Sequence, residues 1–197
     1  PEDLTVESVL IPMISTSRAS TYTLCVSSQV GCAMGCGFCE TAQMGLIRSL
    51  TPGEIVAQWF HAVHTIGHRP KNLVFMGMGE PMDNYDNVMQ AIAVLKDHNG
   101  PHVALSSITI STVGRIDGIR KMAEQIQKPG WHRLQLALSL NASNDAVRDS
   151  IMPINRKWKI ADLKAELMAW PRFAGNKICI EYVLIPGVND SESHLAE

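Results

Sequence analysis

The stretch Leu134-Gln135-Leu136-Ala137-Leu138 is almost wholly apolar, and Leu73-Val74-Phe75-Met76 is another of the same kind. Strands of this composition are typical of a parallel sheet that is covered on both faces, since neither face then needs polar residues. Stretches with the helical spacing of apolar residues lie between such strands. The pattern indicates βαβ units, in which a helix connects neighbouring parallel strands.

The same alternation of strand and helix runs along most of the chain. Thr51, Pro52 and Glu54 mark one helix start, as N-cap, first helical residue and capping-box acid. We expect strands at Val6–Ile11, Tyr22–Val26, Leu73–Met76, Ser107–Ile110, Leu134–Leu138 and Ile178–Leu184. We expect helices at Pro52–Ile66, Asn84–Lys96, Arg115–Gln127, Asp145–Ser150, Ile160–Ala169 and from about Glu192.

About five strand–helix units fit into the 197 residues, whereas a full (βα) barrel needs eight. We therefore expect an α/β fold with either a partial barrel or an open parallel sheet. In both architectures ligands bind beyond the carboxyl ends of the strands. Polar or glycine-rich stretches follow several expected strands, which indicates one shared site: Gly31–Cys39, Gly77–Pro81, Ser111–Gly114, Ser139–Asn141 and Pro186–Asp190.

The composition excludes several classes of protein. The chain is 46% hydrophobic and 18% charged with a formal net charge of −2, which argues against a disordered chain and a strongly basic nucleic-acid module. No apolar run approaches the ~18 residues that a membrane span needs, and no signal peptide precedes the first strand. Because the sequence begins without Met and ends in what reads as the start of a helix, we expect a fragment of a longer protein.

The cysteines carry the strongest chemical signal. Three of the five, Cys32, Cys36 and Cys39, fall within eight residues, and an odd count without a secretory signal indicates a reducing compartment. The glycines among them let the backbone wrap around one centre. Three thiolates suit an iron–sulfur cluster with one open iron. A zinc site completed by a fourth ligand and a set of buried structural thiols are the alternatives.

The loop Cys32-Ala33-Met34-Gly35-Cys36-Gly37-Phe38-Cys39 resembles the cluster-binding loop of the radical S-adenosylmethionine (radical SAM) superfamily. Five segments resemble its RlmN/Cfr group of RNA adenine methyltransferases and together favour the adenine-C2 branch over the C8 branch: Thr23–Cys32, Phe75–Pro81, Asn84–Val88, Met152–Lys157 and Glu181–Asp190. The resemblance implies a partial (βα)6-type TIM barrel, truncated here after about five βα units. It implies the end of an N-terminal region with its first strand over residues 1–20 and a radical SAM core over residues 21–197, which is incomplete at its C-terminal end. An N-terminal accessory domain and a C-terminal cysteine segment are expected outside the sequence.

The resemblance also implies two cofactors, a [4Fe–4S] cluster and SAM. Cys32, Cys36 and Cys39 would bind the cluster and leave one iron for the amino and carboxylate groups of SAM. Gly79 and Glu80 would meet the amino end of SAM, although a Gly-Pro turn whose Glu faces water is the alternative. The other SAM contacts that it implies are Ser111, Ser139, Leu140 and Asn141. The family usually has His where Asn141 stands, and a serine at a strand end is otherwise often a helix cap.

Two catalytic residues follow from the same resemblance. Glu7 matches the family's proton acceptor, and we expect partial burial in its strand; a solvent-facing Glu on an edge strand is the alternative. Cys25 matches the family's second reactive cysteine. In the family, a first, methyl-carrying cysteine becomes crosslinked to the adenine, and the second cysteine resolves this crosslink by forming a disulfide with the first. The alternative is that Cys25 is a strand residue packed inside the protein. The methyl-carrying cysteine is expected well beyond Glu197, and Cys179 is expected to be a core strand residue.

The implied partners are 23S rRNA, tRNA or both, and a small flavodoxin-type electron donor in the cytoplasm. The run Asn155-Arg156-Lys157-Trp158-Lys159 combines cations with an aromatic ring, as phosphate contact and base stacking require, and Arg148 would extend that surface. Two other functions compete with this one. They are a radical SAM enzyme of another reaction class and a non-enzymatic iron–sulfur or zinc module.

Overall fold

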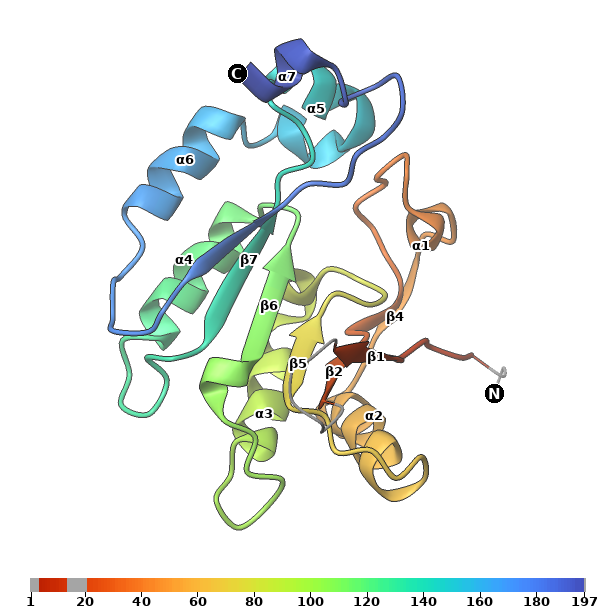
Figure 1. The fold of residues 1–197 in the computed structure, drawn as a ribbon, viewed down its shortest axis with the longest axis vertical. Helices are drawn as coiled ribbons and strands as arrows, with labels where there is room; N and C mark the ends of the chain where they lie inside the picture. Colours follow the sequence, from red (N-terminus) through yellow and green to blue (C-terminus); the bar gives the residue numbers. More distant parts are fainter. Residues whose placement is uncertain (1–3, 14–20, 197) are drawn as a thin grey trace.

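A computed structural model describes residues 4–13 and 21–196, and its central feature is a six-stranded sheet in the order β1-β2-β5-β6-β7-β8 (Figure 1). The five strands from β2 to β8 in this order are parallel, and β1 is antiparallel to β2. The predicted α/β fold with a mostly parallel sheet is therefore confirmed. The strands are β1 (Val9–Met13), β2 (Thr21–Cys25), β5 (Asn72–Phe75), β6 (Ile108–Thr112), β7 (Gln135–Ser139) and β8 (Ile178–Glu181).

Helices connect the parallel strands in chain order. Helix α2 begins at Pro52 as predicted, because the Thr51 hydroxyl accepts from the Glu54 N–H at 3.3 Å and the Glu54 carboxylate accepts from the Thr51 N–H at 2.8 Å. The helices are α1 (Glu40–Gln43), α2 (Pro52–His64), α3 (Tyr85–Leu95), α4 (Ile116–Gln125), α5 (Asp145–Ile151), α6 (Ile160–Met168) and α7 (Glu192–Ala196), with 3₁₀ turns η1 (Pro81–Asn84), η2 (Leu105–Ser107) and η3 (Pro153–Arg156). None of the described helices is long and apolar enough to span a membrane.

Aliphatic side chains fill the layer between the sheet and these helices. Leu73, Ile108 and Leu136 on three neighbouring strands are at most 1% exposed, and they belong to one core with Ile92 of α3 and Ile119 of α4. Burial of each such side chain contributes roughly 1.5–3 kcal/mol to folding. This core holds the carboxyl ends of the strands in fixed positions, where the loops begin.

The carboxyl ends of four parallel strands surround one pocket. Phe75 of β5, Ser111 of β6, Ser139 of β7 and Glu181 of β8 all line it. Burial raises the pKa of the Cys25 thiol at the end of β2, and the Glu181 carboxylate raises it further.

A short hairpin that the sequence pattern did not indicate carries the cysteine loop. Strands β3 (Gln29–Gly31) and β4 (Leu46–Ser49) pair antiparallel, and the Cys32 N–H donates to the Gly45 carbonyl at 3.0 Å. Gly31 has a φ of +75°, and a Cβ there would lie 1.8 Å from the Gly45 oxygen. Only glycine therefore permits this close approach at the base of the loop.

Strand β8 departs from two expectations. It ends at Glu181 rather than Leu184, and Cys179 is exposed, so its prediction as a core residue is wrong. The reason is that β8 is the edge strand of the sheet, with only β7 beside it. The predicted division of the chain between residues 20 and 21 stays a prediction; β1, from the first part, pairs with β2.

Candidate active site

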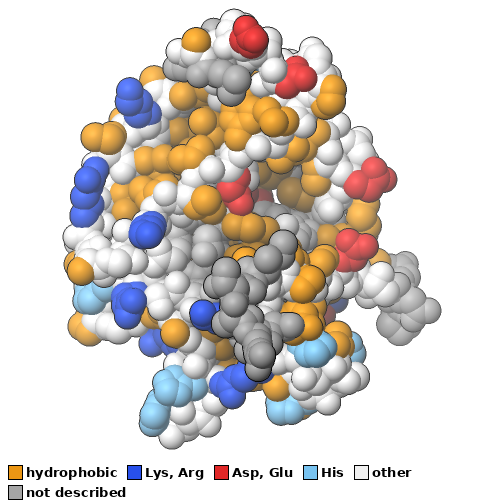
Figure 2. Space-filling view, in the orientation of Figure 1, with side chains coloured by type: hydrophobic (Ala, Val, Ile, Leu, Met, Phe, Trp, Pro, Cys, Tyr) orange, Lys and Arg blue, Asp and Glu red, His pale blue; other side chains and the backbone are white. Residues whose placement is uncertain are grey.

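A pocket of about 290 Å³ lies at the carboxyl ends of the parallel strands. Its size is at the lower end of the range of small-molecule sites. Figure 2 shows hydrophobic side chains gathered around a hollow in the upper half of the visible face. The parallel strands point toward this half in Figure 1. The lining includes most of the predicted cofactor-binding and cluster-binding residues, contributed by four separate segments: Cys32, Cys36, Cys39, Gly79, Glu80, Ser111, Ser139 and Asn141. The structure therefore brings together groups that are far apart in the sequence.

The cysteine loop forms one wall of this pocket. Cys32 and Cys36 are 8% and 5% exposed, and Cys39 is partly exposed. Burial raises the pKa of the Cys36 thiol to about 12, and the fields of Cys32 and Cys39 add to this effect. Burial likewise raises the pKa of Cys32. All three cysteines line the same pocket.

The donor set fits an iron–sulfur cluster. Thiolates are the ligands that iron–sulfur clusters take, and binding of iron replaces the protons that the raised pKa values retain. No three His, Cys, Asp or Glu side chains in the described part of the chain are close enough to hold a single metal ion. In a cubane cluster each thiolate binds a different iron, so three sulfur atoms need not converge on one point.

The loop is seated on the segment that joins α5 to η3. The Gly37 N–H donates to the Ile151 carbonyl at 2.9 Å. Cys32 and Cys36 pack with Ile151 and Met152 in a small apolar cluster, separate from the main core. The position of the cysteines is thus set by α5 and η3 as well as by the hairpin at the base of the loop.

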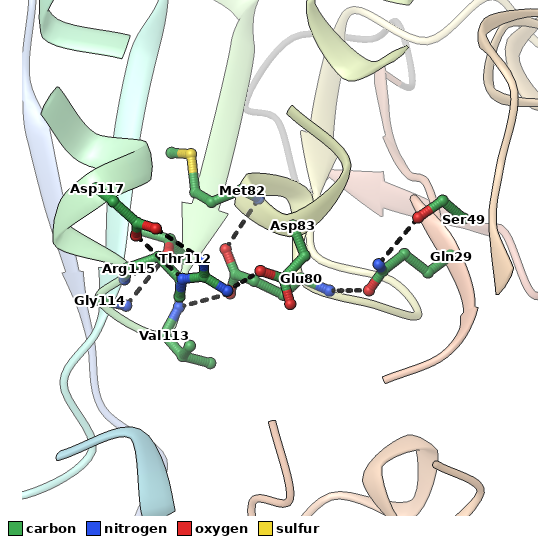
Figure 3. Close-up of polar contacts among 10 residues, drawn as sticks. All are labelled: Gln29, Ser49, Glu80, Met82, Asp83, Thr112, Val113, Gly114, Arg115 and Asp117. Atoms are coloured by element: carbon green, nitrogen blue, oxygen red, sulfur yellow. Dashed lines mark hydrogen bonds and ion pairs between the residues drawn. The ribbon is translucent and has the colours of Figure 1, made fainter. Parts of the chain in front are cut away.

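Glu80 links two walls of the pocket (Figure 3). Its carboxylate is 2% exposed and accepts from the Met82 N–H at 3.1 Å and from the Val113 N–H at 2.9 Å. Burial raises the pKa of Glu80, and the hydrogen bonds from Val113 and Met82 oppose that effect. The carboxylate therefore caps η1 and ties it to the loop after β6. The alternative that Glu80 faces water in a Gly-Pro turn is therefore wrong, because its side chain is buried.

Gly79 has the backbone conformation that this turn requires. Its φ is +96°, and a Cβ there would lie 2.5 Å from the Gln29 Cβ. The Gln29 side-chain oxygen accepts from the Glu80 N–H at 2.9 Å (Figure 3). The turn after β5 thus packs directly against β3, next to the cysteine loop.

Ser111 and Ser139 both donate to the carboxylate of Glu181, a pocket residue that was not predicted from the sequence. The Ser111 hydroxyl donates to Glu181 Oε2 at 2.5 Å, and the Ser139 hydroxyl donates to the same oxygen at 3.1 Å. A serine hydroxyl has one proton, so each serine oxygen offers only lone pairs to a ligand. This wall accepts hydrogen bonds and suits ligand hydroxyl or ammonium groups. The available signal was a single acid within the otherwise largely apolar strand expected at Ile178–Leu184.

Asn141 holds the loop after β8 in place. It is 2% exposed, adopts a φ of +57°, and its side-chain oxygen accepts from the Val183 N–H at 2.9 Å. The Asn189 side-chain amide donates to the Asn141 carbonyl at 2.8 Å and to the Val183 carbonyl at 2.8 Å. The adjacent Leu140 is not among the pocket-lining residues.

The two predicted catalytic residues lie outside the pocket lining. Glu7 is exposed and precedes β1, so the expected burial within a strand is wrong, and the Glu7 carbonyl accepts from the Ser27 hydroxyl at 2.6 Å. Cys25 ends β2 and is partly exposed. All five cysteines belong to the described residues and are free thiols, so the disulfide predicted for Cys25 is not supported. The catalytic roles of Glu7 and Cys25 stay predictions.

The predicted RNA-contact run separates into buried and exposed residues. Arg148 and Asn155 are fully buried, so the expectation that Arg148 extends an exposed basic surface is wrong. The guanidinium is enclosed because three loop carbonyls and Asn155 surround it. Lys159 is held in an ion pair with Asp149 at 2.7 Å. Arg156 and Lys157 are exposed, and the Lys157 ammonium lies 4.3 Å from the ring centre of Trp158.

Comparison with known proteins gives consistent matches. The chain matches the Radical SAM superfamily over residues 26–197. It is 43% identical over 196 residues to a probable dual-specificity RNA methyltransferase RlmN from Akkermansia muciniphila, covering 96% of the chain and 53% of that protein. It is 47% identical over 194 residues to a dual-specificity RNA methyltransferase RlmN from Anaeromyxobacter sp., covering 94% of the chain and 48% of that protein.

A solved structure is similar over the same region. The crystal structure of a radical SAM methyltransferase from Sphaerobacter thermophilus matches with a TM-score of 0.84 at 40% identity, covering 97% of the chain and 54% of that protein. The chain thus spans about half the length of the relatives that it matches.

Proposed function

Because this chain belongs to the radical SAM superfamily, we propose that it is the catalytic core of an RNA methyltransferase. The proposed reaction methylates C2 of an adenosine in 23S rRNA, in tRNA or in both. The relatives named dual-specificity RNA methyltransferase RlmN, at 43% and 47% identity, support this substrate class. Membership of the superfamily implies a [4Fe–4S] cluster and SAM as cofactors.

One observation carries the proposal. Three cysteines on one loop and polar groups at the ends of four parallel strands line the same pocket. A mononuclear site or a structural thiol cluster would not require the strand-end polar groups, whereas a cluster that binds a polar ligand requires both. The arrangement therefore favours an enzyme site over a purely structural one.

Cys32, Cys36 and Cys39 are the proposed ligands of the cluster, which when bound supplies the electron that cleaves SAM to a 5′-deoxyadenosyl radical. The turn at Gly79 and Glu80 lines the pocket together with the cysteine loop, and glycine is required at position 79 because a Cβ would clash with Gln29. Glu80 acts there by holding the turn, because its carboxylate is occupied by two backbone N–H groups.

The wall formed by Ser111, Ser139 and Glu181 is proposed to bind hydrogen-bond donors of SAM. Its oxygen atoms accept, and the ribose hydroxyl groups of a nucleoside donate. Glu181 is partly exposed, and a carboxylate that accepts such bonds contributes more than a neutral acceptor does. Asn141, which also lines the pocket, holds this wall in place because its side-chain oxygen accepts from the Val183 N–H next to β8.

Glu7 and Cys25 are proposed to act on the RNA base. Glu7 is exposed, which suits a group that takes a proton from a substrate arriving at the surface. Cys25 lies at the end of β2, and its thiol is proposed to resolve the crosslink with the methyl-carrying cysteine. That cysteine is proposed to lie outside these 197 residues.

The proposed partners follow from the same chemistry. Arg156 and Lys157, the exposed cations of the basic run, are candidates for contact with RNA phosphates. A flavodoxin-type protein is the proposed electron donor. With ribosomal or transfer RNA as substrate, the proposed compartment is the cytoplasm.

The experiment uses the full-length protein that contains this chain, expressed in a strain that lacks the corresponding gene. We expect ribosomal and transfer RNA from the deletion strain to lack 2-methyladenosine by mass spectrometry, and the intact gene to restore it. Cys36→Ala should abolish restoration, while Cys179→Ser, which changes an exposed thiol outside the pocket, should restore it fully. Unchanged 2-methyladenosine in the deletion strain would refute the proposed substrate. Release of 5′-deoxyadenosine without RNA methylation would instead indicate another radical SAM reaction.

A further inference from the structure

Arg148 is a fully buried cation that the proposed mechanism does not use. It lies on α5 with 0% exposure. Its guanidinium donates to the Leu140 carbonyl at 2.9 Å, to the Val113 carbonyl at 2.7 Å and to the Ser139 carbonyl at 3.2 Å. A fourth bond goes to the side-chain oxygen of Asn155 at 3.0 Å. All four acceptors are uncharged, so these bonds satisfy the donors without neutralising the charge.

Within residues 4–13 and 21–196, no carboxylate forms an ion pair with this guanidinium. Asp145 and Asp149 lie one step further away, where both accept from the Asn155 amide, at 3.0 and 2.7 Å. Asp149 is itself paired with Lys159. Burial lowers the pKa of Arg148 to about 10, because the guanidinium loses its contact with water. A buried cation is costly unless an anion balances it.

The position of Arg148 connects it to the cysteine loop. Met152, one turn along the chain, donates its N–H to the Arg148 carbonyl at 2.8 Å, and the adjacent Ile151 carbonyl accepts from Gly37. Cys32 and Cys36 pack on the same two residues, Ile151 and Met152. The guanidinium is thus fixed at the ends of β6 and β7, and the same helix ends in the residues on which the cysteine loop packs.

We propose that Arg148 is a positioning residue and a fixed counter-charge for the iron–sulfur cluster held by Cys32, Cys36 and Cys39, and that its charge favours the reduced state of that cluster. The inference rests on the proposed function, since it requires the cluster. A cluster bound by three thiolates carries negative charge, and taking up one electron from an external reductant increases that charge by one. A nearby cation held in a low-dielectric interior stabilises the more negative state, and net charge is one of the determinants of cluster potential.

Three substitutions separate the charge from the hydrogen bonds. Arg148→Gln and Arg148→Met remove the charge, the first keeping an amide donor, and Arg148→Lys keeps the charge but loses the guanidinium fork. Arg120→Gln is the matched control, because it removes an exposed arginine whose partner is Glu166 on the surface of α6. Each reconstituted full-length variant is titrated anaerobically with dithionite, and the cluster is followed by its visible absorption and electron paramagnetic resonance.

We expect the neutral variants to lower the equilibrium constant for one-electron reduction about tenfold, a shift of ~59 mV to more negative potential. Arg148→Lys should stay within about threefold of the wild type, and Arg120→Gln should not differ from it, since a distant exposed charge is screened. Loss of the four hydrogen bonds lowers the stability of all three Arg148 variants, so thermal unfolding in the cluster-free state reports the structural contribution separately.

Equal potentials in the wild type and a folded neutral variant would overturn the inference. If neither neutral variant folds, Arg148→Lys decides the question, because a tenfold shift with the charge retained would assign the effect to geometry. Failure of the proposed function has a different signature, namely wild-type protein that binds no cluster or does not cleave SAM.

Discussion

The Glu80 carboxylate gives the sharpest test of how the pocket is built. Replacing it with alanine leaves the Met82 and Val113 N–H groups without acceptors in the interior. Each unsatisfied buried N–H costs about 1–3 kcal/mol, so Glu80→Ala should lower the free energy of unfolding by about 2–6 kcal/mol. Glu80→Gln keeps one oxygen and turns an amide NH₂ toward the other N–H, so about half of that loss is expected.

Urea unfolding of the cluster-free protein, followed by far-ultraviolet circular dichroism, measures these free energies. Glu124→Ala is the control, because it removes an exposed acid from α4 and should change stability by less than about 0.5 kcal/mol. Binding of S-adenosylhomocysteine, measured by calorimetry, distinguishes the two roles of Glu80. A Glu80→Ala protein that is as stable as the wild type but binds the nucleoside poorly would refute our reasoning, since the carboxylate would then contact the ligand and not the chain.

Three further outcomes are expected. Glu54, paired with Arg48, has a pKa lowered from 4.5 to about 2. The small stability that this exposed pair contributes is therefore present above pH 4.5 and is lost as the pH falls toward 2. Chemical unfolding of Glu54→Gln should show a lower stability than the wild type at about pH 7 and a difference that closes over that range; a constant difference would exclude the carboxylate as its cause. Glu181→Gln should weaken S-adenosylhomocysteine binding by about tenfold in calorimetry, because an ionised acceptor is lost, and unchanged affinity would show that the ligand does not use this wall. Gly31→Ala places a Cβ 1.8 Å from the Gly45 oxygen, so the iron content after reconstitution should fall below half of the wild-type value, whereas full loading would show that the hairpin is dispensable.

The sequence predicted the fold well where local and tertiary signals agree. The start of α2 follows from Thr51, Pro52 and Glu54 alone, because a capping box is a local arrangement. The strands β5 and β7 follow from apolar runs, because both faces of a parallel sheet are buried. The positions of the cysteines and serines in one pocket follow from strand order, because the carboxyl ends of parallel strands share one edge.

The errors come from long-range contacts. The β3–β4 hairpin escaped notice because its strands are short and fourteen residues of loop separate them. Burial of Arg148 depends on three backbone carbonyls, of Val113 after β6 and of Ser139 and Leu140 at the end of β7, which no sequence periodicity indicates. The early end of β8 depends on Asn141 taking the Val183 N–H that would otherwise extend the sheet. In each case a hydrogen bond between distant segments overrides the local pattern.

The bond between the Cys32 N–H and the Gly45 carbonyl has a bearing on how the protein withstands oxygen. This bond joins the two ends of the segment that carries Cys32, Cys36 and Cys39, and it forms between backbone atoms without iron. We therefore expect both ends of this segment to keep their positions when the metal is lost by oxidation. A new supply of iron and sulfide should then be enough to restore the site.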